Sequence, residues 1–465
     1  MKRSLVNDIH SQLNPTEVKE IFSARSVEQI QELVKKPRDI DESLCIAGGR
    51  HSMGGQQFIE NGILIDMSKM DKVTNFDSEQ GLIEIEAGIQ WPKLVEYYLN
   101  LQKGNNKQWG IAQKQTGADR FSIGGTISSN SHGRGLAMKP IVDNIETLTI
   151  INNQGELVRC SRNENSDLFK LVIGGYGLFG IIVSATLRLV PRRKIQRTVE
   201  VIGIETLIDL FKKRISEGFL YGDFQFSIDE KNDDFMHKGV LSTYKPIDSD
   251  IAMAKNKKKL SKRDWNNLLL LAHTDKTRAF EIYSNYYLST SGQMYWSDTH
   301  QLSSYIDNYH SFIDKKSKAK KKSNEIITEI YIPRSFLLPF INKARDYFRE
   351  NKINLIYGTI RLIEEDTESF LPWARGSWVC IVFNLHTEHT KEGIENSTKA
   401  FRHLIDLSIE FDGSYSLTYH KFATKRQVEA CYPKFKEFLV LKRQYDPKEI
   451  FQSDWYKHYK ALFSA

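Results

Sequence analysis

The sequence predicts an α+β protein built from two domains. Three observations lead to this class. The chain has 465 residues, more than one ordinary hydrophobic core accommodates. Hydrophobic residues make up 40% of it, as in a globular protein. Short strand candidates lie between glycine-rich turns up to about residue 192, and from residue 193 strand and helix candidates alternate at longer spacing, so we place a domain boundary there.

The first domain is expected to span residues 1–192. Aliphatic and β-branched runs between turns predict strands, and the run "VDNIETLTIINNQGELVRCS" predicts a hairpin that turns at Asn153-Gln154-Gly155. Helices are expected at "WPKLVEYYLN" and "NSDLFKLVIGG", and a strand at "GIIVSATLRLVP" closes the domain.

The second domain is expected at 193–415, where strand–helix–strand units predict a sheet with helices on one face. Its strand candidates include "YGDFQFSID", "EIITEIYIP", "INLIYGTIRLI" and "WVCIVFNLH". Residues 416–465 form a C-terminal helical segment. Two helices are expected there, separated by a turn at Tyr432-Pro433 and ending near Asp446-Pro447.

The net charge of +7 is local, because the lysine-rich runs 254–263 and 315–322 together carry more positive charge than the whole excess. We expect both runs to be exposed loops away from the ligand site. Peripheral contact with an anionic membrane is the alternative, and no motif indicates a specific nucleic-acid partner. Four scattered cysteines predict neither a metal site nor disulfides. The chain lacks an apolar run of membrane-spanning length and a signal sequence, so we expect a cytoplasmic protein, membrane-associated in the alternative.

The stretch "IAGGRHSMGGQQ", residues 46–57, combines four glycines with Arg50 and His51. Glycines allow close approach of the backbone, and main-chain N–H groups beside an arginine can hold a pyrophosphate. The stretch is neither a Walker loop nor G-x-G-x-x-G opening a helix. Taken alone, it could equally be a surface turn.

Two more glycine clusters follow, "TGADRFSIGGTISSNSHGRG" at 116–135 and "IGGYGLFGI" at 173–181. The first of these also carries small hydroxyl side chains that can donate to phosphate or ring oxygens. Three clusters in one α+β domain suggest a long ligand with a central pyrophosphate and a flat ring.

These clusters resemble the FAD-binding domain of the vanillyl-alcohol-oxidase / p-cresol-methylhydroxylase flavoproteins. The pattern is similar to that of the aldonolactone and alditol oxidases and of the decaprenylphosphoryl-ribose oxidases, as is the C-terminal "YP…F…K…YDP…FQSDWY". The resemblance implies an N-terminal FAD-binding domain, an antiparallel-sheet substrate (cap) domain, and a chain that returns to the FAD domain at its C-terminus.

The resemblance also implies which residues bind FAD, with the pyrophosphate on the loop 48–56. His51 stands where several branches bond a histidine covalently to the flavin, and we expect this bond here, whereas other branches bind FAD without it. The implied cofactor-binding residues are Gly48, Gly49, Arg50, His51, Ser52, Met53, Gly54, Gln56, Thr116, Gly117, Ser122, Gly124, Gly125, Ser128, Asn130, His132, Gly133 and Ile182.

For catalysis, the resemblance points to Arg361 and to Lys421, or His420 if the register slips. The aldonolactone branch has Glu-x-Arg on the matching strand, whereas Thr359 stands here in place of the glutamate. Two polar residues on an interdomain surface remain the alternative for the 420–421 pair.

Weaker catalytic candidates are Asn384 and His386. The polar-aromatic segment 295–305 suits either sugar stacking or a buried capping role.

We therefore expect an FAD-dependent oxidoreductase that oxidises a CH–OH group of a sugar, polyol or lactone-like small molecule by hydride transfer to flavin N5. The electron acceptor is oxygen or another compound. The alternative is a non-catalytic flavin-binding module that docks on anionic surfaces through the lysine-rich loops.

Overall fold

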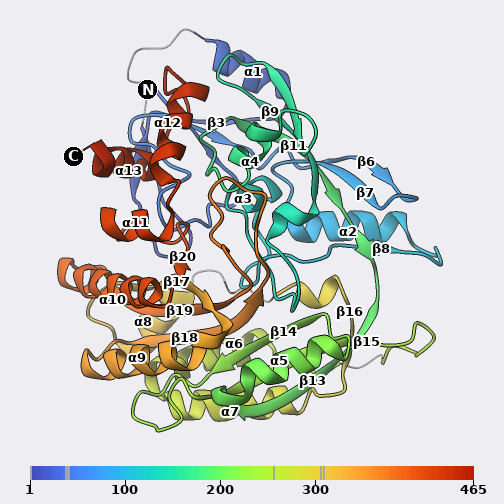
Figure 1. Cartoon of the computed structure of the whole chain (residues 1–465), viewed down its shortest axis with the longest axis vertical. Coiled ribbons are helices and arrows are strands. Elements are labelled where there is room, and N and C mark those ends of the chain that lie inside the picture. The colour runs from blue at the N-terminus through green and yellow to red at the C-terminus, as the bar shows by residue number, and fades with distance from the viewer. Residues whose placement is uncertain (1–2, 37–41, 255–256, 304–305, 307–308, 465) are drawn as a thin grey trace.

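The computed structural model describes residues 3–36, 42–254, 257–303, 306 and 309–464. Figure 1 shows two regions: the N-terminal sheets with the last three helices at one end, and a large sheet with its helices at the other. No helix in the described ranges combines the length and the hydropathy that a membrane crossing requires.

The glycine-rich loop 48–57 joins two neighbouring parallel strands, β4 and β5. These strands and β3 form a three-stranded sheet in the order β3-β5-β4. Helix α1 makes the crossover from β3 to β4, capped by Ser26. The bounds are β1 Ser4–Val6, β2 Thr16–Val18, β3 Glu20–Ser23, α1 Val27–Lys35, β4 Leu44–Ala47 and β5 Ile63–Asp66.

A five-stranded antiparallel sheet, in the order β10-β9-β11-β7-β6, completes the N-terminal region. The expected hairpin is confirmed: β9 pairs with β10, and Gly155 turns between them with a φ of +76°. The bounds are β6 Val73–Asp77, β7 Leu82–Glu86, α2 Trp91–Leu101, β8 Trp109–Gly110, α3 Ile123–Ser128, η1 Ile141–Asn144, β9 Ile145–Ile151, β10 Leu157–Ser161, α4 Ser166–Val172, β11 Ile181–Arg188 and β12 Val190–Pro191.

The large sheet has eight antiparallel strands in the order β16-β13-β15-β14-β18-β19-β17-β20. The bounds are β13 Lys194–Gly203, η2 Ile204–Thr206, α5 Leu207–Ser216, β14 Tyr221–Phe226, β15 Lys238–Pro246, α6 Lys262–Thr274, α7 Lys276–Leu288, β16 Met294–Trp296, η3 Thr299–Gln301, α8 Tyr309–Ser317, β17 Ser323–Pro333, η4 Arg334–Phe336, α9 Leu337–Glu350, β18 Leu355–Ile363, β19 Trp378–Glu388, α10 Lys391–Glu410 and β20 Ser414–Tyr415.

Helices lie on both faces of this sheet, not on one as the sequence pattern suggested. On β19, Phe383 packs against Phe340 and Phe348 of α9, whereas His386 lies against His273 of α6. Successive side chains of a strand point to opposite faces, so odd- and even-numbered positions of β19 contact different helices. The sequence pattern did not predict helices α6 to α8, which adjoin the lysine-rich runs.

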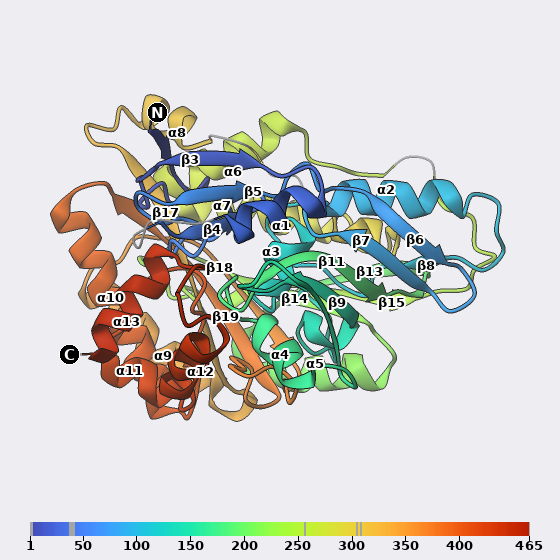
Figure 2. The same ribbon diagram turned by 90° about the horizontal axis from the view of Figure 1, so that it is seen from above.

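The C-terminal segment returns to the N-terminal sheets. The expected turn after α11 and the end of α12 are confirmed, and a further helix, α13, follows. The Leu44 N–H donates to the Ile450 carbonyl, and Leu44 forms a parallel bridge with Phe451. The bounds are α11 Lys425–Cys431, α12 Phe435–Tyr445 and α13 Asp454–Ser464. Figure 2 shows these helices on the side opposite to α2, β6 and β7.

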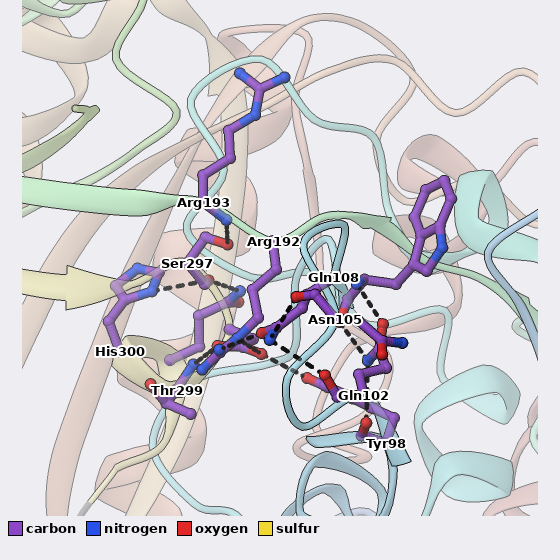
Figure 3. A network of polar contacts seen from close by, with 12 residues as sticks. Tyr98, Gln102, Asn105, Gln108, Arg192, Arg193, Ser297, Thr299 and His300 are labelled. Atoms are coloured by element: carbon purple, nitrogen blue, oxygen red, sulfur yellow. Dashed lines mark hydrogen bonds and ion pairs between the residues drawn. The ribbon is translucent and has the colours of Figure 1, made fainter. Parts of the chain in front are cut away.

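A buried ion pair joins the two regions where the chain passes between them. Arg192 Nε lies 2.8 Å from Asp298 Oδ2, to which the Tyr98 hydroxyl also donates across 3.0 Å. Arg192 additionally donates to Gln108, and these side chains form the network in Figure 3. The described part of the segment 295–305 therefore covers the junction between the two regions, as the capping alternative predicted. Its residues Tyr295 and His300 also face the cavity described next. Residues 304–305 lie outside the described residues.

Candidate active site

A cavity of about 1010 Å³ is lined by residues of the N-terminal region and by the large sheet. This is the upper end of the volume range of small-molecule sites. One part of its wall consists of the three glycine clusters, and another consists of β14, β17, β18 and β19 together with α6 and α7. The cavity therefore connects the two regions of the chain.

Nearly all of the residues predicted to bind the cofactor line this cavity. They are Gly48, Gly49, Arg50, His51, Ser52, Met53, Gln56, Thr116, Gly117, Ser122, Gly124, Gly125, Ser128, Asn130, His132 and Ile182. Gly54 and Gly133 do not line it. Their N–H groups instead donate to Gln56 Oε1 and Gln113 Oε1. The two glycines therefore stabilise the loops without contacting the cavity.

The backbone of the glycine clusters packs closely against neighbouring atoms. A Cβ at Gly48 would lie 2.0 Å from Ser122 Oγ, so only glycine fits between the first and second clusters. Arg50, Asn130 and Tyr176 line the cavity with φ values of +58°, +46° and +53°, a region that residues with side chains seldom occupy. Such backbone strain concentrates at ligand sites.

His51 is held by its neighbours on one side and has an unused nitrogen on the other. Its Nδ1 lies 2.8 Å from His10 Nε2, and its ring stacks on Phe121 at 4.0 Å between centroids. Its Nε2 is buried and makes no hydrogen bond of good geometry with any described residue, although the Arg120 backbone contacts the ring. Burial, aided by His10, lowers the pKa of His51 to about 3, so the imidazole is neutral at physiological pH.

Arg361 lines the cavity from β18, and its buried Nε has no hydrogen-bond partner in the described structure. In the register of the sheet, Arg361 and Tyr331 both pair with Cys380 of β19. These three residues therefore form a row on one face of β17, β18 and β19.

His420 and Lys421 do not line the cavity. The His420 ring stacks with Phe401 and Phe422, its Nε2 lies 3.1 Å from Thr328 Oγ1, and burial lowers its pKa to about 3. Lys421 lies near Gly55, and its pKa is lowered by burial, which Asp454 partly offsets. The segment turns here, so the structure does not bring either residue together with Arg361.

Tyr419, the residue before them, is the one that faces the cavity. Its hydroxyl donates to Glu329 Oε1 across 3.0 Å, and the Tyr331 hydroxyl donates to Oε2 across 2.6 Å. His132 Nε2 lies 3.3 Å from Oε2, and its Nδ1 lies 3.0 Å from the Gly133 carbonyl.

Glu329 is thus surrounded by polar groups in a buried position. Burial alone would raise the pKa of its carboxyl, but the charge and hydrogen bond of His132 and the Tyr331 hydroxyl outweigh burial and lower the pKa to about 2. Burial and the neighbouring Glu329 raise the pKa of Tyr419. At neutral pH the carboxylate is therefore ionised and the phenol is protonated.

Sequence reasoning missed Glu329, which lies in the apolar run "EIITEIYIP" of β17. A charged residue within a buried strand was the available signal, because such groups are seldom buried unless they are paired. Asn384, a weaker candidate, lines the cavity, and His386 does not.

The two lysine-rich runs differ in position. Lys257, Lys258 and Lys259 line the cavity beside Tyr286 and Tyr295, contrary to our expectation of a loop away from the site. The run 315–322 is exposed and contributes no residue to the cavity. The expectation of loops is wrong in part, because residues 315–317 belong to α8 and residues 262–263 to α6. Residues 257–260, just before α6, line the cavity, which the sequence alone did not reveal, and residues 255–256 of this run lie outside the described residues.

Comparison with known proteins identifies the N-terminal region. Residues 18–161 match the FAD binding domain family. This part of the chain is therefore similar to FAD-binding domains. The D-arabinono-1,4-lactone oxidase of Yarrowia lipolytica is 33% identical over 192 residues, which is 40% of this chain and 35% of that protein.

Other relatives match the same share of the chain. The L-gulonolactone oxidase of Bos taurus is 28% identical over 189 residues, 40% of this chain and 41% of that protein. Cytokinin dehydrogenase 1 of Arabidopsis thaliana is 29% identical over 191 residues, 39% of this chain and 32% of that protein. The matches thus span about a third to two fifths of each relative, and the resemblance to the aldonolactone oxidases is confirmed for the FAD-binding domain.

The cavity fits FAD in three respects. Its glycine wall leaves backbone where a Cβ could not be accommodated, and His51 Nε2 is a buried polar atom without a well-formed hydrogen bond to a described residue. Arg50 adds a cation to this wall, as a pyrophosphate requires. The region similar to FAD-binding domains therefore supplies the glycine-cluster wall of the cavity, and the large sheet supplies another wall.

Proposed function

We propose that the protein is an FAD-dependent oxidoreductase that oxidises a CH–OH group of a sugar, polyol or lactone-like substrate. The observation that supports this is one cavity that connects the FAD-binding loops with Arg361, Glu329 and Tyr419. In this proposal residues 193–415 act as the substrate domain, and the segment 416–465 completes the site through Tyr419.

FAD, when bound, supplies the hydride acceptor. Arg361 holds the substrate oxygen and stabilises the negative charge that develops on it as its proton passes to solvent water, because the guanidinium is permanently charged and its Nε makes no hydrogen bond to a described residue. Glu329 is a positioning residue: its carboxylate orients the Tyr419 hydroxyl and His132. Its lowered pKa makes it a weak proton acceptor at neutral pH.

The substrate end of the cavity suits a sugar. Tyr283, Tyr286, Tyr287 and Tyr295 contribute to its wall, and such rings offer both apolar faces and hydroxyl groups. Lys257 to Lys259 add positive charge beside them, which favours a sugar that carries an anionic group.

We also propose that His51 bonds covalently to FAD through Nε2. The neutral ring can act as a nucleophile, and His10 holds Nδ1, which leaves Nε2 for the bond. The bond would replace a C–H bond of the 8α methyl group of the flavin. The proton would pass to solvent, and the two electrons would reduce the flavin, from which the electron acceptor would remove them. Acid precipitation of the purified protein should leave a yellow pellet, and His51→Ala should release the colour into the supernatant. His10→Ala should lower the covalently bound fraction while flavin still binds. A colourless wild-type pellet would contradict the bond and leave the binding of FAD intact.

A substrate screen tests the activity. Sugars, polyols and aldonolactones are added to the flavin-loaded protein in air, and hydrogen peroxide and the oxidised product are measured. Peroxide formation would identify oxygen as the acceptor, and turnover that requires an added dye would indicate another acceptor. A flavin-loaded protein that none of these compounds reduces would contradict the proposed reaction and favour a non-catalytic flavin-binding module.

A further inference from the structure

A second group of titratable side chains lies on β17, four residues before Glu329. Glu325 is directly opposite His386 of the neighbouring strand β19 in the register of the sheet, and His273 approaches from α6. None of these three side chains lines the cavity. We call Glu325, His273 and His386 the His–Glu cluster.

Three potential ligand atoms converge in this cluster. Glu325 Oε1 lies 3.1 Å from His273 Nε2 and 3.7 Å from His386 Nδ1, and all three atoms lie within 4.8 Å of one another. Zinc bonds of about 2.0–2.1 Å in a tetrahedral site place neighbouring ligand atoms about 3.3 Å apart. The distances from Glu325 Oε1 to the two histidine nitrogens, 3.1 and 3.7 Å, bracket that value.

These atoms lie close to one another, but the geometry of their contacts is poor for hydrogen bonds. Glu325 Oε1, His273 Nε2 and His386 Nδ1 are all buried and lack a hydrogen bond of good geometry within the described part of the chain. Glu325 is only 3% exposed. Buried polar atoms without a well-formed hydrogen bond are costly, and one shared metal ion would satisfy all three.

The other oxygen of Glu325 is fixed. The Tyr309 hydroxyl donates to Oε2, and His310 Nδ1 lies 3.0 Å from it. Both residues belong to α8. Outer contacts of this kind orient a carboxylate ligand and leave Oε1 available.

We propose that the His–Glu cluster binds a divalent transition-metal ion, with Zn²⁺ as the expected ion. Imidazole nitrogen and carboxylate oxygen are ligands that Zn²⁺ accepts, and two histidines with one glutamate leave a fourth position for water. The ion joins α6 to the strands β17 and β19, and through Tyr309 and His310 it joins α8 as well. The site is outside the cavity, so its role is to fix the helices that cover this end of the sheet.

The alternative to a metal site is that the Glu325 carboxylate pairs directly with His273 and His386. The two interpretations differ in whether the purified protein binds a metal ion. The flavin-loaded protein is treated with EDTA, dialysed and titrated with Zn²⁺ by calorimetry, and bound zinc is measured by elemental analysis. We expect about one equivalent of zinc and a rise in Tm on zinc addition.

Glu325→Gln and His386→Asn should each weaken zinc binding at least tenfold, within the range seen when a ligand or its support is lost. His403→Asn is the matched control, because His403 stacks on Tyr347 of α9 away from the cluster. Flavin content reports folding and is independent of the metal. Wild-type protein that binds no more zinc than a non-metalloprotein, or variants that bind it as the wild type does, would overturn the proposal.

X-ray absorption of the zinc-loaded wild type provides a measurement that needs no variant. The cluster predicts nitrogen and oxygen neighbours with two imidazole rings. Sulfur scattering would instead place the zinc at His132, Glu329 and Cys380, a second group of possible ligands, and would contradict the assignment.

Discussion

The hydroxyl of Tyr419 donates a hydrogen bond of 3.0 Å to Oε1 of Glu329. This bond connects the returning C-terminal segment to strand β17 at the cavity wall. Because the same carboxylate also accepts from Tyr331 and contacts His132 of the FAD-binding domain, groups from three separate parts of the chain meet at one side chain. Glu329 thereby links the glycine-cluster wall of the cavity to the wall formed by the large sheet.

The first prediction concerns the rate at which substrate reduces the bound flavin. Arg361→Met should slow it roughly a hundredfold or more, as the loss of one preorganised charge-stabilising donor does elsewhere. Tyr419→Phe should act in the same direction. His420→Phe is the control, since that ring lies outside the cavity. Rapid-mixing absorbance measures the rate, and equal rates in all three variants and the wild type would refute the assignment.

Glu329→Gln adds a test of the positioning role. The neutral amide keeps the shape of the side chain but weakens its contacts with His132 and with the two tyrosines. We expect substrate to reduce the flavin of Glu329→Gln more slowly than that of the wild type, with flavin content unchanged. We also expect Tyr419→Phe to slow flavin reduction less in the Glu329→Gln background than in the wild type. Fully additive effects of the two substitutions would show that the residues act independently.

The second prediction concerns pH and His420. Its folded pKa of about 3 lies below the ordinary value of 6.5, so between these values the unfolded chain binds a proton that the folded chain does not. The free energy of unfolding should therefore fall as pH decreases from 6.5 toward 3. His420 contributes at most about 1.4 kcal/mol per pH unit.

In His420→Phe the free energy of unfolding should decrease less as the pH falls. His10 and His51 should account for part of the remaining decrease. Urea unfolding at pH 7 and pH 5 measures the difference. An identical pH dependence in the variant and the wild type would show that the buried ring does not behave as described.

The third prediction concerns the lysines at the cavity. Replacing Lys257, Lys258 and Lys259 by glutamine should lower kcat/KM for an anionic sugar by roughly tenfold at low salt, because the local positive charge attracts it. The matched control replaces Lys315, Lys316 and Lys320, which changes the net charge equally at exposed positions away from the cavity. The effect should shrink as ionic strength rises. An equal loss for a neutral sugar would argue against charge attraction.

The fourth prediction concerns the junction of Figure 3. Asp298 is fully buried, and Arg192 and Tyr98 depend on it for their contacts. Asp298→Asn leaves the guanidinium buried without its counter-charge, which should cost about 3 kcal/mol of stability. Asp209→Asn breaks an exposed pair with Lys212 and should cost less than about 1 kcal/mol. Equal Tm values for the two variants would show that the junction does not stabilise the fold.

The glycine loops were predictable from sequence because their chemistry depends on the backbone. Gly48 must be glycine where Ser122 approaches, so both the motif and its place in the cavity could be read from residue types. The strands were predictable for a similar reason, since hydrophobic periodicity follows directly from burial.

The substrate wall was less predictable, because it depends on which face of a strand points inward. Glu329 and Arg361 lie on different strands, and only the sheet register places them on the same face. At the C-terminal turn, a shift of one residue decides whether Tyr419 or His420 faces the cavity. Sequence alone could identify that segment but not the side chain.

The most direct test of the central claim is the absorbance spectrum of the purified protein under anaerobic conditions, before and after a sugar, polyol or aldonolactone is added. We predict a flavin spectrum that at least one such compound bleaches, and a bleaching rate that falls strongly in Arg361→Met. A protein that cannot be loaded with FAD, or a flavin band that these compounds leave unchanged in the wild type, would contradict the account.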